Sequence, residues 1–191
     1  MKAIVFIDVQ NDFLKNGKLE FGYPVKDNLQ KIVDFAKECV ADSSCKIYAT
    51  RDTHEATKWI ERAGAQVVVG YLATLEGIKL PVEHCVEGTD GWQVATSLMD
   101  VILGHATFIN KPTFGSFDLA DIINEDFTSD LDEIIIVGYD AAICVISNAL
   151  ILRAKFPNVK ITIKRELCGC SNKESFDAAM AVASACQIDV E

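Results

Sequence analysis

The chain has 191 residues, with 18 Lys and Arg against 28 Asp and Glu, so its formal charge is −10, and half of its residues are hydrophobic. This balance is typical of one acidic globular domain, and it argues against nucleic acid or an anionic membrane as the main partner, because few basic side chains are left to bind phosphate groups. No apolar run approaches the ~20 residues that span a bilayer, and the first apolar segment meets a charge at Asp8 too early for a signal peptide. The sequence therefore predicts a cytoplasmic protein that acts on a small molecule.

Short apolar segments rich in Ile and Val alternate with longer amphipathic segments. In chain order, we expect strands at residues 2–9, 46–50, 106–110, 133–137, 159–164 and 187–190, and helices at residues 27–40, 141–155 and 172–185. The apolar run 134–137 does not alternate with polar residues, which is typical of a strand covered on both faces. These patterns predict a single α/β domain with a mostly parallel sheet between helices.

Residues 55–90 form the least regular part of the sequence. A short helix at 55–62 and a short strand at 66–69 are expected there, followed by a long loop through residues 80–85. Long loops inside compact domains usually serve a function, so we expect this segment to form a wall of the functional site.

Seven cysteines lie at positions 39, 45, 85, 144, 168, 170 and 186. The count is odd, and a domain of this size can bury a sufficient core without disulfides, so we predict reduced thiols. Cys168 and Cys170 lack a second cysteine pair, which gives little support to a zinc site at that position.

Reactive side chains follow the predicted strands. They are Asp8 after the first strand, Asp52 and His54 after the second, Lys111 after the third, and Asp140 and Cys144 after the fourth. Ligands bind at the carboxyl ends of the strands in open α/β sheets, so we expect an acid, a cation and a thiol to meet at one edge of the sheet.

Cys144 falls at the start of a predicted helix. Unpaired backbone N–H groups and the helix dipole favour a thiolate there, and the same N–H groups can hold an oxyanion. Asp8 could accept the thiol proton and Lys111 could stabilise the resulting charges. The alternatives are a buried packing cysteine, a polar turn at Asp8 and a solvated lysine.

Asp52 and His54 are two residues apart, which places both side chains on one side of an extended segment. His84 and Glu76 lie in the irregular region, which could fold back over Asp52 and His54. Together these residue types favour a metal site. The alternative is that Asp52 or Thr53 caps the next helix and that His84 is exposed.

Five segments in order resemble the isochorismatase-like cysteine hydrolases, whose best-known amidase branch is the nicotinamidases. They are VFIDVQNDF (5–13), TRDTH (50–54), LPVEHCVEGTDG (80–91), NKP (110–112) and VGYDAAICV (137–145). The resemblance covers essentially the whole chain, and it implies a three-layer α/β/α sandwich.

The resemblance implies a catalytic triad of Asp8, Lys111 and Cys144. It also implies a cis peptide bond before Asp140, which would turn the Asp140 amide beside the Cys144 amide to form an oxyanion hole. Two aromatic residues within or beside the matching motifs, Phe13 and Tyr139, are assigned to substrate binding on the same basis.

Nicotinamidase-like members hold a zinc, iron or manganese ion beside the triad. The resemblance assigns Asp52, His54 and His84 to such an ion, and the remaining ligand is Glu76 or Glu61, because residues 56–70 look inserted. It implies no organic cofactor, and it favours a homo-oligomer.

The implied reaction is hydrolysis of a small carboxamide to the acid and ammonia through a thioester, with nicotinamide as the leading substrate. Carbamoyl or ureido compounds such as N-carbamoylsarcosine are the alternative substrates. Ala141 and Ala142 stand where the family usually has Thr-Asp. This difference leaves open a non-catalytic protein of the same fold that binds a ligand or undergoes thiol redox chemistry.

Overall fold

The main sheet has six strands. The computed structural model describes residues 1–23, 28–127 and 129–191, so the predicted helix start at residue 27 lies outside the described residues. The strands are β1 (Lys2–Ile7), β2 (Cys45–Asp52), β5 (Ala106–Lys111), β6 (Glu133–Gly138), β7 (Lys160–Cys168) and β8 (Asp189–Val190). Neighbouring strands are parallel throughout, in the order β5-β2-β1-β6-β7-β8, which confirms the predicted sheet.

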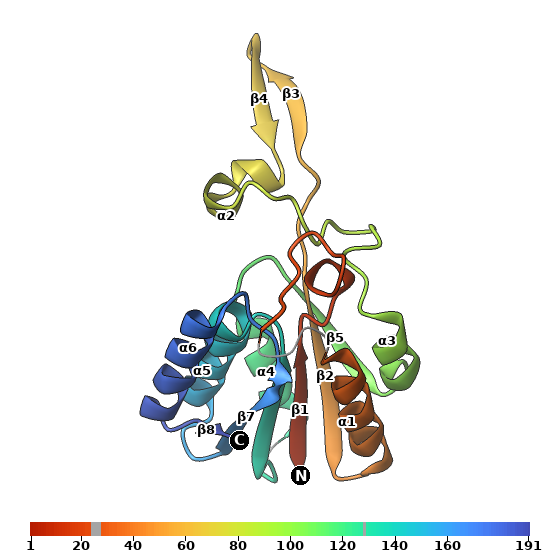
Figure 1. The fold of residues 1–191 in the computed structure, drawn as a ribbon, viewed down its shortest axis with the longest axis vertical. Helices are drawn as coiled ribbons and strands as arrows, with labels where there is room; N and C mark the ends of the chain where they lie inside the picture. The colour runs from red at the N-terminus through yellow and green to blue at the C-terminus, as the bar shows by residue number, and fades with distance from the viewer. Residues whose placement is uncertain (24–27, 128) are drawn as a thin grey trace.

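Helices cover both faces of this sheet (Figure 1). On one side lie α1 (Leu29–Ala41) and α3 (Thr96–Ile102), and on the other lie α4 (Phe117–Asp126), α5 (Ile146–Lys155) and α6 (Lys173–Ala185). The three-layer α/β/α prediction is therefore confirmed. Neither α3 nor α4 was predicted from the sequence.

The two layers of helices explain why the central strands are apolar at consecutive positions. Along β1, Val5 and Ile7 belong to the core cluster of α4, α5 and α6, whereas Ile4 and Phe6 belong to the cluster of α1 and α3. Successive side chains of a strand point to opposite faces, so a strand covered on both sides buries each of them.

A segment between β2 and α3 projects beyond the carboxyl ends of the main strands (Figure 1). It contains an antiparallel hairpin of β3 (Lys58–Arg62) and β4 (Ala65–Val69), followed by α2 (Leu75–Lys79). The strand expected at 66–69 is confirmed, but the helix expected at 55–62 is wrong. Ala63 and Gly64 have φ of 52° and 78°, and a two-residue turn with two positive φ angles matches the twist of a hairpin.

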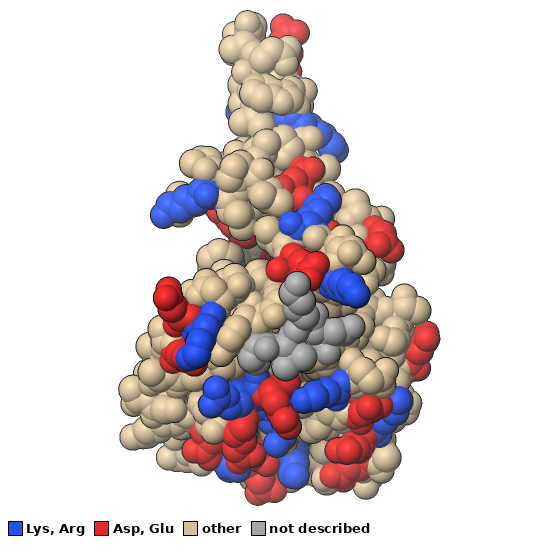
Figure 2. Space-filling model, viewed as in Figure 1, with Lys and Arg blue, Asp and Glu red and all other residues tan. Residues whose placement is uncertain are grey.

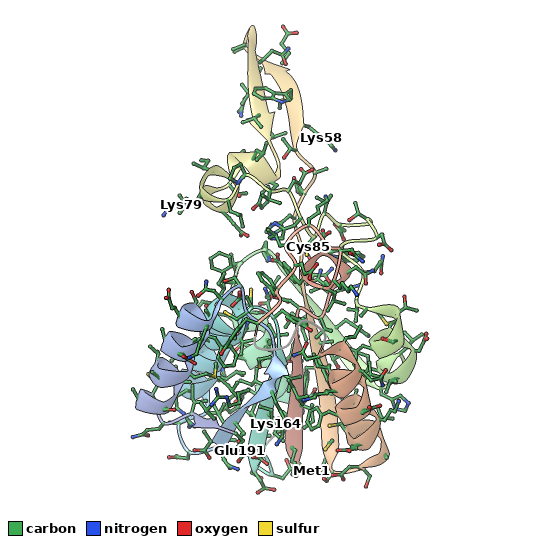
Figure 3. The ribbon with its side chains drawn as sticks, viewed as in Figure 1. Met1, Lys58, Lys79, Cys85, Lys164 and Glu191 are labelled. Atoms are coloured by element: carbon green, nitrogen blue, oxygen red, sulfur yellow. The ribbon has the colours of Figure 1, made fainter. Side chains whose placement is uncertain are left out.

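Charged side chains gather on the body of the molecule and are sparser on the projecting segment in the face shown (Figure 2). Both termini lie at the end opposite this segment, where Lys164 Nζ is 3.3 Å from Glu191 Oε2 (Figures 1 and 3). All seven cysteines are free thiols. Within the described ranges, every helix is too short or too polar to cross a bilayer.

Candidate active site

The polar side chains predicted from the strand ends meet where the strand order reverses. β1 lies between β2 and β6. The chain adds β2 and β5 on one side of β1, and then β6, β7 and β8 on the other side. Asp8 follows β1, Lys111 ends β5, and Cys144 lies in the helical turn after β6. A reversal of strand order creates a crevice at the carboxyl ends of parallel strands, and these three residues lie at it.

Asp8, Lys111 and Cys144 are in direct contact and almost fully buried. Lys111 Nζ is 2.6 Å from Asp8 Oδ2 and 3.5 Å from Cys144 Sγ. The expected convergence of an acid, a cation and a thiol is therefore present, and the alternative of a solvated lysine is wrong, because Lys111 is 1% exposed.

Asp8 is held in an unusual backbone conformation by a residue that sequence reasoning missed. Its φ is 48°, in the left-handed region that non-glycine residues seldom adopt. Thr50 Oγ1 donates a hydrogen bond to Asp8 Oδ1 at 2.6 Å and accepts one from the Asp8 N–H at 3.2 Å. Such strain persists when surrounding contacts fix it, and it is common at functional sites. The signal in the sequence that could have identified Thr50 is a polar residue inside a strand covered on both faces.

Burial controls the proton affinities of this cluster. Burial raises the pKa of Asp8, although Lys111 opposes the shift. Burial also raises the pKa of the Cys144 thiol well above its usual value, Lys111 opposes this, and the Asp8 carboxylate adds to it. Burial alone would lower the pKa of Lys111, but the charge of Asp8 raises it. The site therefore favours a protonated thiol, in contrast to the thiolate expected from the helix start alone.

The turn that carries Cys144 is fixed by the side chain of Asp140. One carboxylate oxygen accepts hydrogen bonds from the Ala142 N–H at 2.6 Å and the Cys170 thiol at 3.2 Å, and the other accepts from the Ser171 N–H at 3.1 Å. Asp140 thus caps the turn and joins it to the loop after β7. Ala141 and Ala142 leave this cap intact.

Asp52, His54, Glu76 and His84 form a second cluster beside the first. One ligand atom from each side chain lies within 4.8 Å of all the others. Asp52 Oδ2 is 2.9 Å from His54 Nε2 and 3.3 Å from His84 Nε2, and Glu76 Oε1 is 3.8 Å and 3.5 Å from the same two nitrogens. The alternative reading is wrong on both counts, since no helix follows Asp52 directly and His84 is 2% exposed.

This cluster fits a divalent cation. His84 Nδ1–H donates to the Val82 carbonyl at 2.8 Å, which orients the ring so that Nε2 faces the other ligands. Asp52 Oδ1 is buried and accepts no hydrogen bond from the described residues. Two imidazoles and two carboxylates suit zinc, iron or manganese. Glu61 lies exposed on the projecting hairpin, so the structure brings Glu76 to the cluster and not Glu61.

The charges of the second cluster depend on one another. Burial would raise the pKa of Asp52, but hydrogen bonds from His54 and His84 lower it below its usual value. Burial would lower the pKa of His84, but Asp52 raises it. Burial and the nearby Asp52 charge raise the pKa of Glu76. Asp52 and His84 thus each favour the charged form of the other.

Two residues that help to position this cluster, Tyr71 and Gly77, were not predicted from the sequence. The Tyr71 ring lies edge-on to both imidazoles, at centroid distances of 4.9 Å from His54 and 5.2 Å from His84, and its hydroxyl donates to the Leu80 carbonyl at 2.8 Å. A Cβ at Gly77 would lie 2.1 Å from the Tyr71 carbonyl oxygen, so only glycine lets α2 approach closely enough to bring Glu76 inward.

An open cleft of about 720 Å³ gives access to both clusters, and Cys144, Asp52, His54, Glu76, His84 and Phe13 are among the residues that line it. The projecting segment forms one wall through α2, as the sequence predicts, and Figure 2 shows a notch between this segment and the body. Figure 3 shows Cys85 at the junction between the two. Tyr139, assigned to substrate binding, instead lines a separate cavity and donates a hydrogen bond to Asn28 Oδ1.

Comparison with known proteins supports one family. A family model described as the isochorismatase domain matches residues 2–191. A search of curated protein sequences finds no match. The nicotinamidase/pyrazinamidase of Bacillus subtilis has a similar structure, with a TM-score of 0.78 and 21% identity over 99% of this chain and 98% of that one.

Two further solved structures are similar to this chain. The pyrazinamidase of Pyrococcus horikoshii in complex with zinc has a TM-score of 0.74 and 20% identity over 100% of this chain and 98% of that one. Yeast nicotinamidase bound to the inhibitor nicotinaldehyde has a TM-score of 0.72 and 20% identity over 100% of this chain and 99% of that one. At these identities the likeness shows a shared fold.

Proposed function

This chain belongs to the isochorismatase family, and from that premise we propose that it is a cysteine hydrolase that converts a small carboxamide to the acid and ammonia, with nicotinamide as the leading substrate. The observation that carries the proposal is the buried contact of Lys111 with both Asp8 and Cys144. A carboxylate, a cation and a thiol in contact at the floor of an open cleft are the groups that nucleophilic attack on an amide requires.

The reaction begins with the proton of Cys144. Because burial raises the pKa of this thiol, the proton stays on sulfur until the substrate arrives, and Asp8 then accepts it as the thiolate attacks the amide carbonyl. Lys111 compensates the negative charge that passes between the two groups. The raised pKa of Asp8 suits a group that must first take this proton and then return it.

In the next step, Asp8 gives the proton to the departing ammonia as the C–N bond breaks and the thioester forms. Water then attacks the thioester, Asp8 accepts its proton, and the acid leaves as Cys144 regains its hydrogen. We assign the oxyanion to the backbone amides of Asp140 and Cys144, with the peptide bond before Asp140 in the cis form. The hydrogen bonds to the Asp140 side chain support this role, because they fix the turn that carries both amides.

A divalent ion would be held by Asp52, His54, Glu76 and His84. When bound, such an ion supplies Lewis acidity, which polarises a carbonyl group or lowers the pKa of water. Lys111 lies close to both clusters, since its Nζ is 3.8 Å from Asp52 Oδ1 and 3.5 Å from Cys144 Sγ.

The test is an ammonia-release screen over nicotinamide, pyrazinamide and carbamoyl amino acids, run with the unchanged chain and with Cys144→Ala. We expect release from nicotinamide or pyrazinamide, and its loss in Cys144→Ala. Release that survives in Cys144→Ala would refute the thioester mechanism. Release from carbamoyl amino acids alone would move the assignment to that substrate class.

A further inference from the structure

Beyond the reacting groups, the wall of the cleft is mainly apolar. Phe13 and Phe21 lie on the side of the loop after β1, Leu75 and Leu80 come from α2 and the residue after it, and Phe114 and Ile143 face the cleft from the body. These side chains come from four separate parts of the chain and line a single cleft with Cys144.

Several of these apolar side chains remain open to water. Leu75 is 69% exposed, Phe114 is 43% exposed, and Leu80 and Ile143 are 38% and 37% exposed. Single exposed apolar residues are ordinary, but a group of them that lines one concave surface is typical of a binding site. Contact with an apolar ligand would remove this surface from water, which is favourable.

The volume of the cleft exceeds the needs of a single-ring amide. Pockets of ~300–1,000 Å³ enclose most of the surface of a drug-sized ligand, and this cleft measures about 720 Å³. Its wall includes three carboxylates, those of Asp52, Glu76 and Asp140. Lys79 is the one Lys or Arg side chain among the described residues that line the cleft, and it is exposed. An uncharged apolar group therefore fits this space better than an anionic one.

We propose that the preferred substrate is a carboxamide whose acyl part carries a second apolar group, a ring or a short alkyl chain, seated between Leu75 and Leu80 on one side and Phe114 and Ile143 on the other. The inference rests on the proposed function for the amide that reacts at Cys144. It adds the substrate class: a substituted aromatic carboxamide is favoured over nicotinamide itself.

Binding tests this proposal separately from turnover. In Cys144→Ala, which lacks the nucleophile, calorimetric titration compares nicotinamide with 6-phenylnicotinamide. We expect the phenyl compound to bind at least about tenfold more tightly, since it buries a further apolar ring. Adding Leu75→Ser and Phe114→Ser should remove most of this preference. Ile78→Ser is the matched control, because Ile78 lies on α2, is 68% exposed and does not line the cleft, so the preference should persist.

The proposal is overturned if the phenyl compound binds no more tightly than nicotinamide, or if its advantage survives Leu75→Ser with Phe114→Ser. Measuring ammonia release from both amides with the unchanged chain separates a failure of the hydrolase proposal from a failure of the substrate-class proposal. A binding preference without release from either amide would refute the hydrolase proposal and leave the ligand class standing. Release from nicotinamide without the binding preference would refute the proposed substrate class and leave the hydrolase proposal standing.

Discussion

Substitution of the buried ion pair between Asp8 and Lys111 should reveal strong coupling. Their charged atoms are 2.6 Å apart, and the two side chains are 0% and 1% exposed. Removing one partner of a buried pair costs ~3–5 kcal/mol, because the other charge stays in a poorly solvating site. We therefore expect a large loss of the free energy of unfolding for both Lys111→Met and Asp8→Asn.

The two single changes should differ in size. In Asp8→Asn, Lys111 keeps a second carboxylate oxygen, Asp52 Oδ1, at 3.8 Å, so its cost belongs near ~3 kcal/mol. In Lys111→Met, both carboxylates lose their cation, so the cost belongs near ~5 kcal/mol. The double variant leaves neither member of the pair charged. It should therefore be more stable than the sum of the single costs predicts, by ~2–3 kcal/mol.

Urea denaturation followed by circular dichroism measures all four members of this cycle. The matched control is the exposed pair of Lys155 and Asp121, whose charged atoms are 2.7 Å apart, and for this pair the same cycle should give a coupling below ~1 kcal/mol. Costs that add to within ~0.5 kcal/mol at Asp8 and Lys111, or a Lys111→Met variant as stable as the unchanged chain, would refute the reasoning.

Three further predictions concern other parts of the molecule. Gly138→Ala should prevent recovery of folded protein in an expression trial, because Gly138 has a φ of 124° and a Cβ there would lie 2.0 Å from the carbonyl oxygen of Ile7 at the end of β1. Recovery of soluble protein that melts cooperatively would contradict this prediction. Zinc should raise the melting temperature of the unchanged chain and of Glu61→Gln, but raise that of Glu76→Gln much less, and an equal rise in both variants would exclude Glu76 as a ligand. Burial would raise the pKa of Glu133, but hydrogen bonds, the strongest from Lys160, lower it below its usual value of 4.5. The stabilisation that Glu133 contributes is therefore present above pH 4.5 and is lost as the pH falls through the pKa of the folded state. Glu133→Gln should therefore lower stability by less than ~1 kcal/mol at pH 7 and have less effect in acid, as urea denaturation at several pH values would check.

The core of the sheet was predictable because its strands have a strong and simple pattern. The run 134–137 is apolar throughout and buried on both faces, so strand type and parallel packing followed from composition alone. The reactive residues were predictable for a related reason. Asp8, Lys111 and Cys144 each follow a recognisable strand, and parallel strands bring their carboxyl ends to one edge.

The projecting segment was less predictable because local conformation decides it. The helix expected at 55–62 is a strand, since the positive φ angles of Ala63 and Gly64 fold that stretch back onto β4, and Ala-Gly is a weaker hairpin signal than Asn-Gly. The start of α4 had a local signal that was missed, since Ser116 accepts a hydrogen bond from the Leu119 N–H as an N-cap.

The protonation of Cys144 could not be predicted from sequence. Its position at a helix start favours a thiolate, whereas burial favours the neutral thiol, and only the fold shows which influence is larger. The same holds for Thr50, whose contact with Asp8 joins residues from two strands.

The short helix α2 has two connections to the site, since Glu76 belongs to the cluster with Asp52, His54 and His84, while Leu75 lines the cleft. A five-residue helix has little stability of its own, so whatever holds one of these residues also restrains the other. Cation and amide would then share the cost of ordering one element, and each would strengthen the binding of the other by the same factor. Measured affinities for either ligand would accordingly have meaning only at a stated concentration of the other.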